Sequence, residues 1–110
     1  MNDQTLDRVF VYGTLQDDET VRRITGRTFP KVKGRLDGYR RMVPTPGFPY
    51  PYAIAQEGAF LAGSLLVGVD PASLLRLDAY EGGFYVRRRV MAATDGGQCE
   101  AWLYEGSSSR

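Results

Sequence analysis

Turn-forming residues divide this 110-residue sequence into segments that are mostly too short for helices. The sequence contains 13 glycines and 6 prolines. The runs between them are rich in β-branched and aromatic residues, at lengths typical of strands. We expect strands at residues 9–12, 52–55, 59–69, 84–93 and 99–104, and two short strands within 32–43. The pattern predicts a small β-barrel or strongly curved sheet with helices packed outside it, in the α+β class.

The connections between these strands follow from the same residues. Gly34 and Gly38 are expected at bulges or turns. A turn at residues 56–58 is expected to join two strands, and residues 95–97 to close a hairpin. Residues 44–51 include four prolines, so this segment is expected to be an irregular loop outside the sheet.

Two short helices are expected outside the sheet. Asp17 or Asp18 can cap a helix over residues 19–25, which ends at Gly26. Asp70 followed by Pro71 is typical of a second helix start, and that helix should end near Glu81, before two glycines.

Length and composition are those of a single globular domain. Hydrophobic residues make up 43% and charged residues 25%, an ordinary balance for a folded chain. We expect one domain over residues 1–110, with flexible ends at 1–7 and 106–110. A net charge of +1 gives no general attraction to nucleic acid. One cysteine and no apolar segment long enough to cross a bilayer favour a cytoplasmic location without membrane contact. The oligomeric state stays open.

The absence of histidine is the strongest constraint on chemistry. With no histidine in the chain, the Ser-His-Asp and Cys-His mechanisms and nearly all zinc sites are excluded. An enzyme of this composition that works near neutral pH would need a carboxyl group with a raised pKa as its proton carrier.

Glu81 is the candidate for that carboxyl group. In the second helix, four residues at relative positions 0, 3, 4 and 7 share one face, namely Leu74, Leu77, Asp78 and Glu81. The leucines direct this face toward the core. Burial and the negative end of the helix dipole would both raise the pKa of Glu81. The alternative is an exposed glutamate at a frayed helix end, or one paired with an arginine of residues 87–89.

Tyr12, Gly13, Thr14 and Leu15 form the second candidate element, directly after a buried strand. A glycine at this place lets the chain turn sharply, and successive N–H groups that face one way can bind an anion such as a carboxylate. The alternative is a simple turn at the end of a strand. Tyrosines, Tyr85 among them, are candidates for lining a pocket.

Two other charged clusters have simpler explanations. Residues 17–19 are all acidic, but they lack the ligand spacing of a calcium loop, and helix capping explains them. No metal site is expected. Residues 87–89 are three arginines, but alternate residues of a strand face opposite sides, so they cannot form one patch for nucleic acid.

In combination, several segments resemble the gamma-glutamylcyclotransferase-like superfamily, and in particular its avirulence-induced-gene-like branch. They cover most of the chain in the order found in the family. The matching stretches are VFVYGTL at 9–15, LDGYRR at 36–41, GSLL at 63–66, LDAYEG at 77–82 and YVR at 85–87.

The resemblance implies a mixed barrel-like α+β fold and an enzyme that needs no metal or cofactor. Its substrate would be a gamma-glutamyl amine or gamma-glutamyl amino acid, cyclised to 5-oxoproline with release of the amine. In the family the first motif binds the gamma-glutamyl group through its main chain, which corresponds to Tyr12, Gly13, Thr14 and Leu15. The glutamate of the later motif is the proton acceptor, which corresponds to Glu81. The alternatives are a non-catalytic module that binds an amino-acid-like anion, or a related hydrolase.

Overall fold

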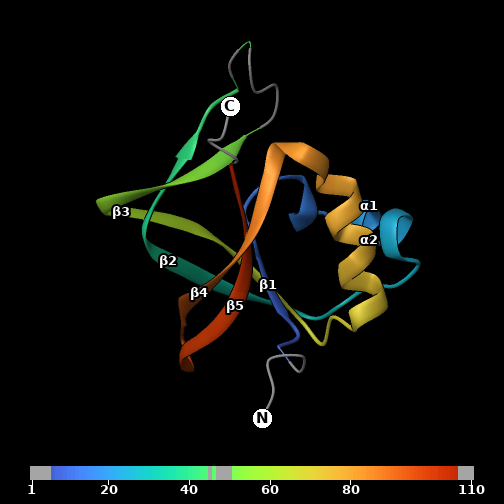
Figure 1. Ribbon diagram of the computed structural model, residues 1–110. Coiled ribbons are helices and arrows are strands. Elements are labelled where there is room, and N and C mark those ends of the chain that lie inside the picture. Colours follow the sequence, from blue (N-terminus) through green and yellow to red (C-terminus); the bar gives the residue numbers. More distant parts are fainter. Residues whose placement is uncertain (1–5, 45, 47–50, 107–110) are drawn as a thin grey trace.

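The computed structural model describes residues 6–44, 46 and 51–106, and these form one closed barrel with two helices on its outside (Figure 1). The elements in chain order are β1 (Arg8–Val11), the short 3-10 helix η2 (Thr14–Gln16), α1 (Asp18–Thr25), β2 (Lys31–Met42), β3 (Tyr52–Val67), α2 (Pro71–Glu81), the 3-10 helix η3 (Gly82–Phe84), β4 (Tyr85–Thr94) and β5 (Gly97–Gly106).

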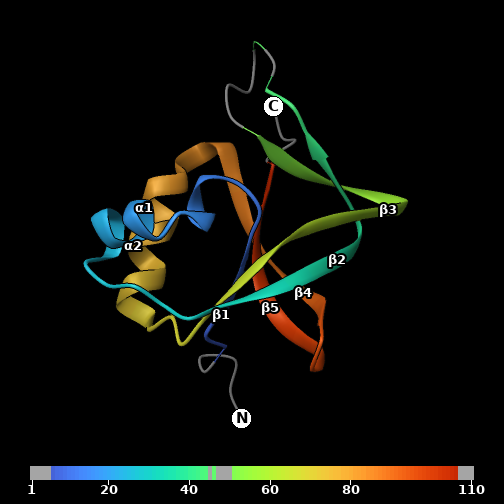
Figure 2. The ribbon, with the colours of Figure 1, turned by 180° about the vertical axis from the view of Figure 1, so that it is seen from behind.

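The barrel has the strand order β1-β3-β2-β4-β5 and closes by pairing β1 with β5. That closing pair is parallel, whereas the other neighbours are antiparallel. The sheet is therefore mixed, as the resemblance implied. Both helices lie together on one side of the barrel, as the reverse view in Figure 2 also shows.

Alternation along β1 divides the core into two parts. Phe10 and Tyr12 belong to a cluster with inward residues of the other strands, such as Leu36 and Leu103. Val9 and Val11 belong to a second cluster, between barrel and helices, which includes Leu77 of α2 and Val21 of α1. Since neighbouring residues of a strand face opposite sides, one short strand contributes to both clusters, and its end lies where barrel and helices meet.

The predicted helix boundaries are confirmed. Asp17 caps α1 by accepting a hydrogen bond from Thr20 N, and Gly26 ends it with a φ of 82°. Asp70 caps α2 in the same way, with Pro71 as its first residue.

The expectation of short strands in the middle of the chain is wrong. Residues 31–42 form one strand rather than two, and no turn interrupts β3 at residues 56–58. Instead the register between these strands passes from the pair Asp37–Phe60 to the pair Tyr39–Ala55. Gly38 and Gly58 both have a φ of 87°, so the glycines produce an irregularity within two long paired strands. Gly34 is simply paired with Gly63.

Within the ends that the sequence predicts to be flexible, three described residues form contacts or are buried. Leu6 O accepts a hydrogen bond from Trp102 Nε1 at 3.2 Å, and Asp7 O accepts one from Val69 N at 2.8 Å. Gly106 is the buried last residue of β5. The rest of the expected ends, and most of the expected loop at 44–51, lie outside the described residues.

Candidate active site

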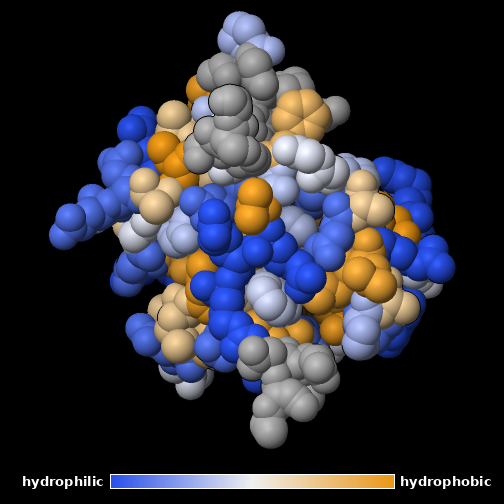
Figure 3. Space-filling view, in the orientation of Figure 1, coloured by the Kyte–Doolittle hydropathy of each residue, from blue (hydrophilic) through white to orange (hydrophobic). Residues whose placement is uncertain are grey.

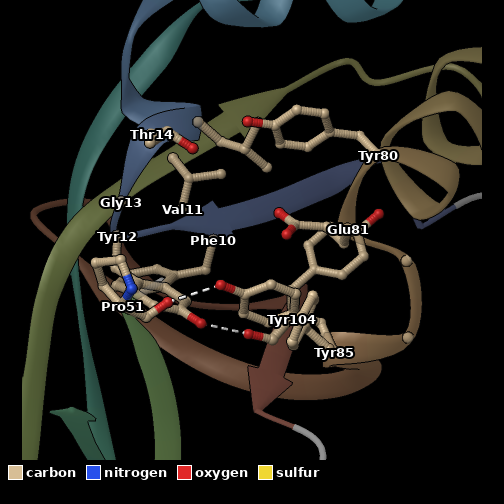
Figure 4. A pocket seen from close by; sticks show the side chains of 14 residues that line it. Phe10, Val11, Tyr12, Gly13, Thr14, Pro51, Tyr80, Glu81, Tyr85 and Tyr104 are labelled. Carbon is tan, nitrogen blue, oxygen red and sulfur yellow. Dashed lines mark hydrogen bonds between the residues drawn. The ribbon is translucent and has the colours of Figure 1, made fainter. Parts of the chain in front are cut away.

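A cavity of about 310 Å³ opens where the end of β1 meets the end of α2 (Figure 4). Segments far apart in the sequence line it: β1 with the loop after it, the last turn of α2, η3, and the ends of β4 and β5. The lining residues are Phe10, Val11, Tyr12, Gly13, Thr14, Leu15, Pro51, Tyr80, Glu81, Gly82, Gly83, Phe84, Tyr85 and Tyr104. All six sequence-predicted site residues are thus brought together.

The loop after β1 is a tight 3-10 turn. Gln16 N donates to Gly13 O at 3.0 Å, and Asp17 N donates to Thr14 O at 3.1 Å. The first N–H groups of such a turn have no partner within it. The Leu15 side chain is buried and anchors the turn against the cluster between barrel and helices. The loop therefore presents fixed main-chain donors at the edge of the cavity.

Glu81 is the last residue of α2 and is half-buried. Figure 4 shows its carboxyl group pointing into the cavity. Leu77, one turn earlier, is completely buried and holds this face of α2 against the barrel. Removal from water raises the pKa of Glu81 from its usual 4.5 to about 7, because burial disfavours the charged form.

Among the described residues, the three arginines at 87–89 form their ion pairs with acidic residues other than Glu81. Arg87 pairs with Asp78, Arg88 with Glu105 and Arg89 with Glu100. Arg87 and Arg89 also stack over the ring of Trp102. The three arginines therefore alternate between the two faces of β4, as predicted.

Two hydrogen-bonded tyrosines form the floor of the cavity. Tyr12 Oη donates to Tyr104 O at 2.5 Å and accepts from Ala53 N at 3.1 Å. Tyr104 Oη donates to Asp78 Oδ1 at 2.6 Å. Burial is the main cause that raises the pKa of both hydroxyl groups, so both stay protonated. Nothing in the sequence indicated these contacts, which depend on barrel closure.

The mouth of the cavity is aromatic. Tyr80 is 48% exposed and Phe84 is 40% exposed. In Figure 4 Tyr80 extends from α2 toward the Thr14 side of the opening. Tyr85 lies deeper and donates from Oη to Pro51 O at 2.8 Å. The sequence signal for Tyr80 and Phe84 was only that they flank Glu81 and the two glycines.

Charge and metal chemistry at the site are limited. Within residues 6–44, 46 and 51–106, the only charged side chain in the lining is Glu81, and no three His, Cys, Asp or Glu side chains could hold a metal ion together. Asp17 is engaged as a helix cap. The space-filling view shows hydrophilic and hydrophobic side chains interspersed over one face (Figure 3). None of the helices in the described part of the chain is long and apolar enough to cross a membrane.

Two proteins of Arabidopsis thaliana have sequences similar to this chain. AIG2-like protein A of Arabidopsis thaliana is 37% identical over 85 residues, which cover 77% of this chain and 51% of that protein. Protein AIG2 C of the same plant is 33% identical over 89 residues, which cover 81% of this chain and 53% of that protein. The chain thus spans about half the length of these relatives.

Solved structures share the fold. A solution structure from Arabidopsis thaliana superposes with a TM-score of 0.85 at 29% identity, over 99% of this chain and 74% of that one. A structure described as gamma-glutamyl cyclotransferase superposes with a TM-score of 0.76 over 92% of this chain and 66% of that one. At 18% sequence identity, this similarity supports a shared fold and nothing more.

A family model described as "Gamma-glutamyl cyclotransferase, AIG2-like" matches residues 9–109. The match includes both segments that line the cavity, the turn after β1 and the end of α2. This chain therefore belongs to the AIG2-like gamma-glutamyl cyclotransferase family.

Proposed function

We propose that this protein cyclises a gamma-glutamyl compound to 5-oxoproline, with Glu81 as general acid and base. The supporting observation is a half-buried carboxyl group with a pKa of about 7 that points into the same cavity as the main-chain amides of the turn after β1. A pKa near the working pH suits a group that must both accept and donate a proton.

The reaction begins with the Glu81 carboxylate, which takes a proton from the substrate's α-ammonium group. The freed amine attacks the γ-carbonyl carbon and forms a five-membered ring. Protonated Glu81 then returns its proton to the leaving nitrogen, and the carbon–nitrogen bond to the leaving group breaks. The ring nitrogen still carries one extra proton, which passes through Glu81 to the released amine, so the amine leaves as an ammonium ion and Glu81 is again a carboxylate. Because attack is intramolecular, the effective concentration of the nucleophile is high and no Ser or Cys nucleophile is needed.

The turn after β1 supplies hydrogen-bond donors for the charged end of the substrate. The described lining contains no lysine or arginine, so the α-carboxylate would rely on the N–H groups at the start of η2, at Thr14 and Leu15. The same donors can stabilise the negative charge that develops on the γ-carbonyl oxygen.

The leaving group would depart past Tyr80 and Phe84, the exposed aromatic residues at the mouth. An α-amino acid as leaving group would bring a second carboxylate close to Glu81. There the described lining offers it no cation. Burying an unpaired charge is costly, which supports a gamma-glutamyl amine over a gamma-glutamyl amino acid.

The test is 5-oxoproline release from a panel of gamma-glutamyl amines and gamma-glutamyl amino acids. Wild type should form product, and Glu81→Gln should lose at least about 100-fold in rate, because glutamine cannot carry the proton. The matched control is Glu57→Gln, on the exposed part of β3, which should behave as wild type.

Other outcomes identify the alternatives. A thermal shift on ligand addition with no product from either protein would contradict the enzymatic proposal and favour a module that binds amino-acid-like anions. Free glutamate instead of 5-oxoproline would indicate a hydrolase that uses Glu81 and water.

A further inference from the structure

Tyr104 forms hydrogen bonds at both of its ends, and they reach opposite sides of the cavity. Its main-chain oxygen accepts from Tyr12 Oη at 2.5 Å, and its own Oη donates to Asp78 Oδ1 at 2.6 Å. The residue is only 4% exposed. The bond from Tyr12 is buried and the bond to Asp78 is partly buried, and a buried polar group that loses its partner is costly.

On one side, Tyr104 fixes the start of the turn after β1. Tyr12 Oη accepts a second hydrogen bond from Ala53 N of β3. Tyr12 is therefore tied to β5 and to β3 by a single hydroxyl group. The next three residues, 13–15, line the edge of the cavity, and the first N–H groups of their 3-10 turn have no partner within that turn.

On the other side, Tyr104 fixes the last turn of α2. Asp78 lies three residues before Glu81, and its Oδ1 also forms an ion pair with Arg87 of β4, at 3.0 Å from Nε. Beyond Glu81 the chain continues through Gly82, with a φ of 62°, and Gly83, which have no side chains to anchor it. The contacts of Asp78, together with buried Leu77, thus hold the helix end in place.

We propose that Tyr104 is a positioning residue that sets the separation between the turn after β1 and the Glu81 carboxyl group. This inference rests on the proposed cyclisation. In that reaction the substrate's carboxylate stays on the turn while its α-nitrogen and leaving nitrogen both come within hydrogen-bond reach of Glu81. A displacement of about 1 Å between such groups can lower the rate by about 100-fold.

The experiment compares Tyr104→Phe with Tyr39→Phe in the 5-oxoproline assay. Tyr39 packs against the barrel interior and its hydroxyl is 3.5 Å from Glu105, but it does not line the cavity. We expect Tyr104→Phe to lower kcat by about 10-fold to 100-fold, with KM changed by less than about threefold. Tyr39→Phe should keep the wild-type kcat.

A double-variant cycle separates positioning from general loss of stability. Asp78→Ala should lose at least as much as Tyr104→Phe, because it also removes the ion pair with Arg87. The double variant should lose no more than Asp78→Ala alone, because the Tyr104 hydroxyl group acts through its bond to Asp78. Asp78→Asn should recover most of kcat, since its amide oxygen still accepts from the hydroxyl group. If Tyr104→Phe does not fold, Asp78→Ala and Asp78→Asn form the comparison.

A measurement without substrate separates this inference from the proposed function. The titration of the Glu81 carboxyl carbon, followed by NMR, should have a lower midpoint in Tyr104→Phe than in wild type, because a displaced side chain regains water. If wild type forms no 5-oxoproline, the proposed reaction fails, and this midpoint alone decides the positioning role. A titration midpoint of Glu81 in Tyr104→Phe equal to that of wild type would overturn the inference. So would a wild-type kcat in Tyr104→Phe, an equal loss in Tyr39→Phe, or additive losses in the double variant.

Discussion

Replacing Glu81 by glutamine should make the protein more stable at alkaline pH while it abolishes activity. Burial raises the pKa of Glu81 from 4.5 to about 7, and about 1.4 kcal/mol corresponds to each pH unit. Ionisation of Glu81 in the folded protein therefore lowers the free energy of unfolding by at most about 3 kcal/mol. Because the side chain is only half-buried, solvent screening reduces the expected value to about 2 kcal/mol.

The sign follows from proton binding. Between pH 4.5 and about 7 the folded chain keeps the Glu81 proton while the unfolded chain has lost it, so the free energy of unfolding falls as the pH rises through this window. Below the window both states are protonated, and above it both are ionised. Glutamine has no proton to lose, so the free energy of unfolding of Glu81→Gln lacks this pH dependence. The difference between Glu81→Gln and wild type should therefore increase by about 2 kcal/mol between pH 4.5 and about 7, in favour of the variant, and stay constant above that window.

Urea unfolding followed by circular dichroism, at several pH values from about 4 to about 8, gives the free energy of unfolding directly. Wild type, Glu81→Gln and the control Glu57→Gln should be compared at each pH. Glu57 is exposed on β3, so its variant should follow the wild-type curve. Suppose instead that the free energy of unfolding of Glu81→Gln differs from that of wild type by the same amount at both ends of the pH range. That result would refute the reasoning, because it would mean that the pKa of Glu81 is not raised by burial.

Three further changes test other parts of the structure. Tyr12→Phe leaves the Ala53 N–H and a β5 carbonyl group without their hydrogen-bond partner, so urea unfolding should show a loss of about 2 kcal/mol. Gly63→Ala would place a Cβ 2.3 Å from a carbonyl oxygen of β1, so the free energy of unfolding should fall by about 2 kcal/mol or more. The control is Gly96→Ala, whose added Cβ has its nearest neighbour at 3.8 Å; this variant should unfold as wild type does. Tyr80→Ala should raise KM for gamma-glutamyl amines severalfold at nearly constant kcat, since this residue is exposed at the mouth and would contact only the leaving group.

Local signals in the sequence were sufficient for the helices. Asp70 and Pro71 start α2 and Gly82 ends it, because capping needs only a side-chain oxygen, a fixed φ and a residue tolerant of a positive φ. The hairpin between β4 and β5 was found for the same reason, since its turn is made by adjacent residues.

Long-range pairing explains what the sequence did not reveal. Gly38 and Gly58 are typical turn signals, yet β2 and β3 continue through them. The pairing of these strands on either side of the irregularity outweighs the local preference of each glycine. No local pattern distinguishes a glycine that ends a strand from one that bends it.

The candidate site shows the same division. The helical spacing of Leu77 and Glu81 was enough to place the carboxyl group on the buried side of α2, because that face is set within one helix. The role of Tyr104 was not accessible, since its two hydrogen bonds join residues 92 and 26 positions apart in the chain. Such contacts exist only once β1 and β5 close the barrel.

The protonation of Glu81 is the most direct test of the account as a whole. The side-chain carboxyl carbon of Glu81 can be followed by NMR across the pH range in the wild-type protein without ligand, with Glu81→Gln used to assign the signal. A midpoint of about 7 is the value expected of a carboxyl group held away from water beside the turn after β1. A midpoint near 4.5, the usual value for a hydrated glutamate, would contradict the proposed proton transfer.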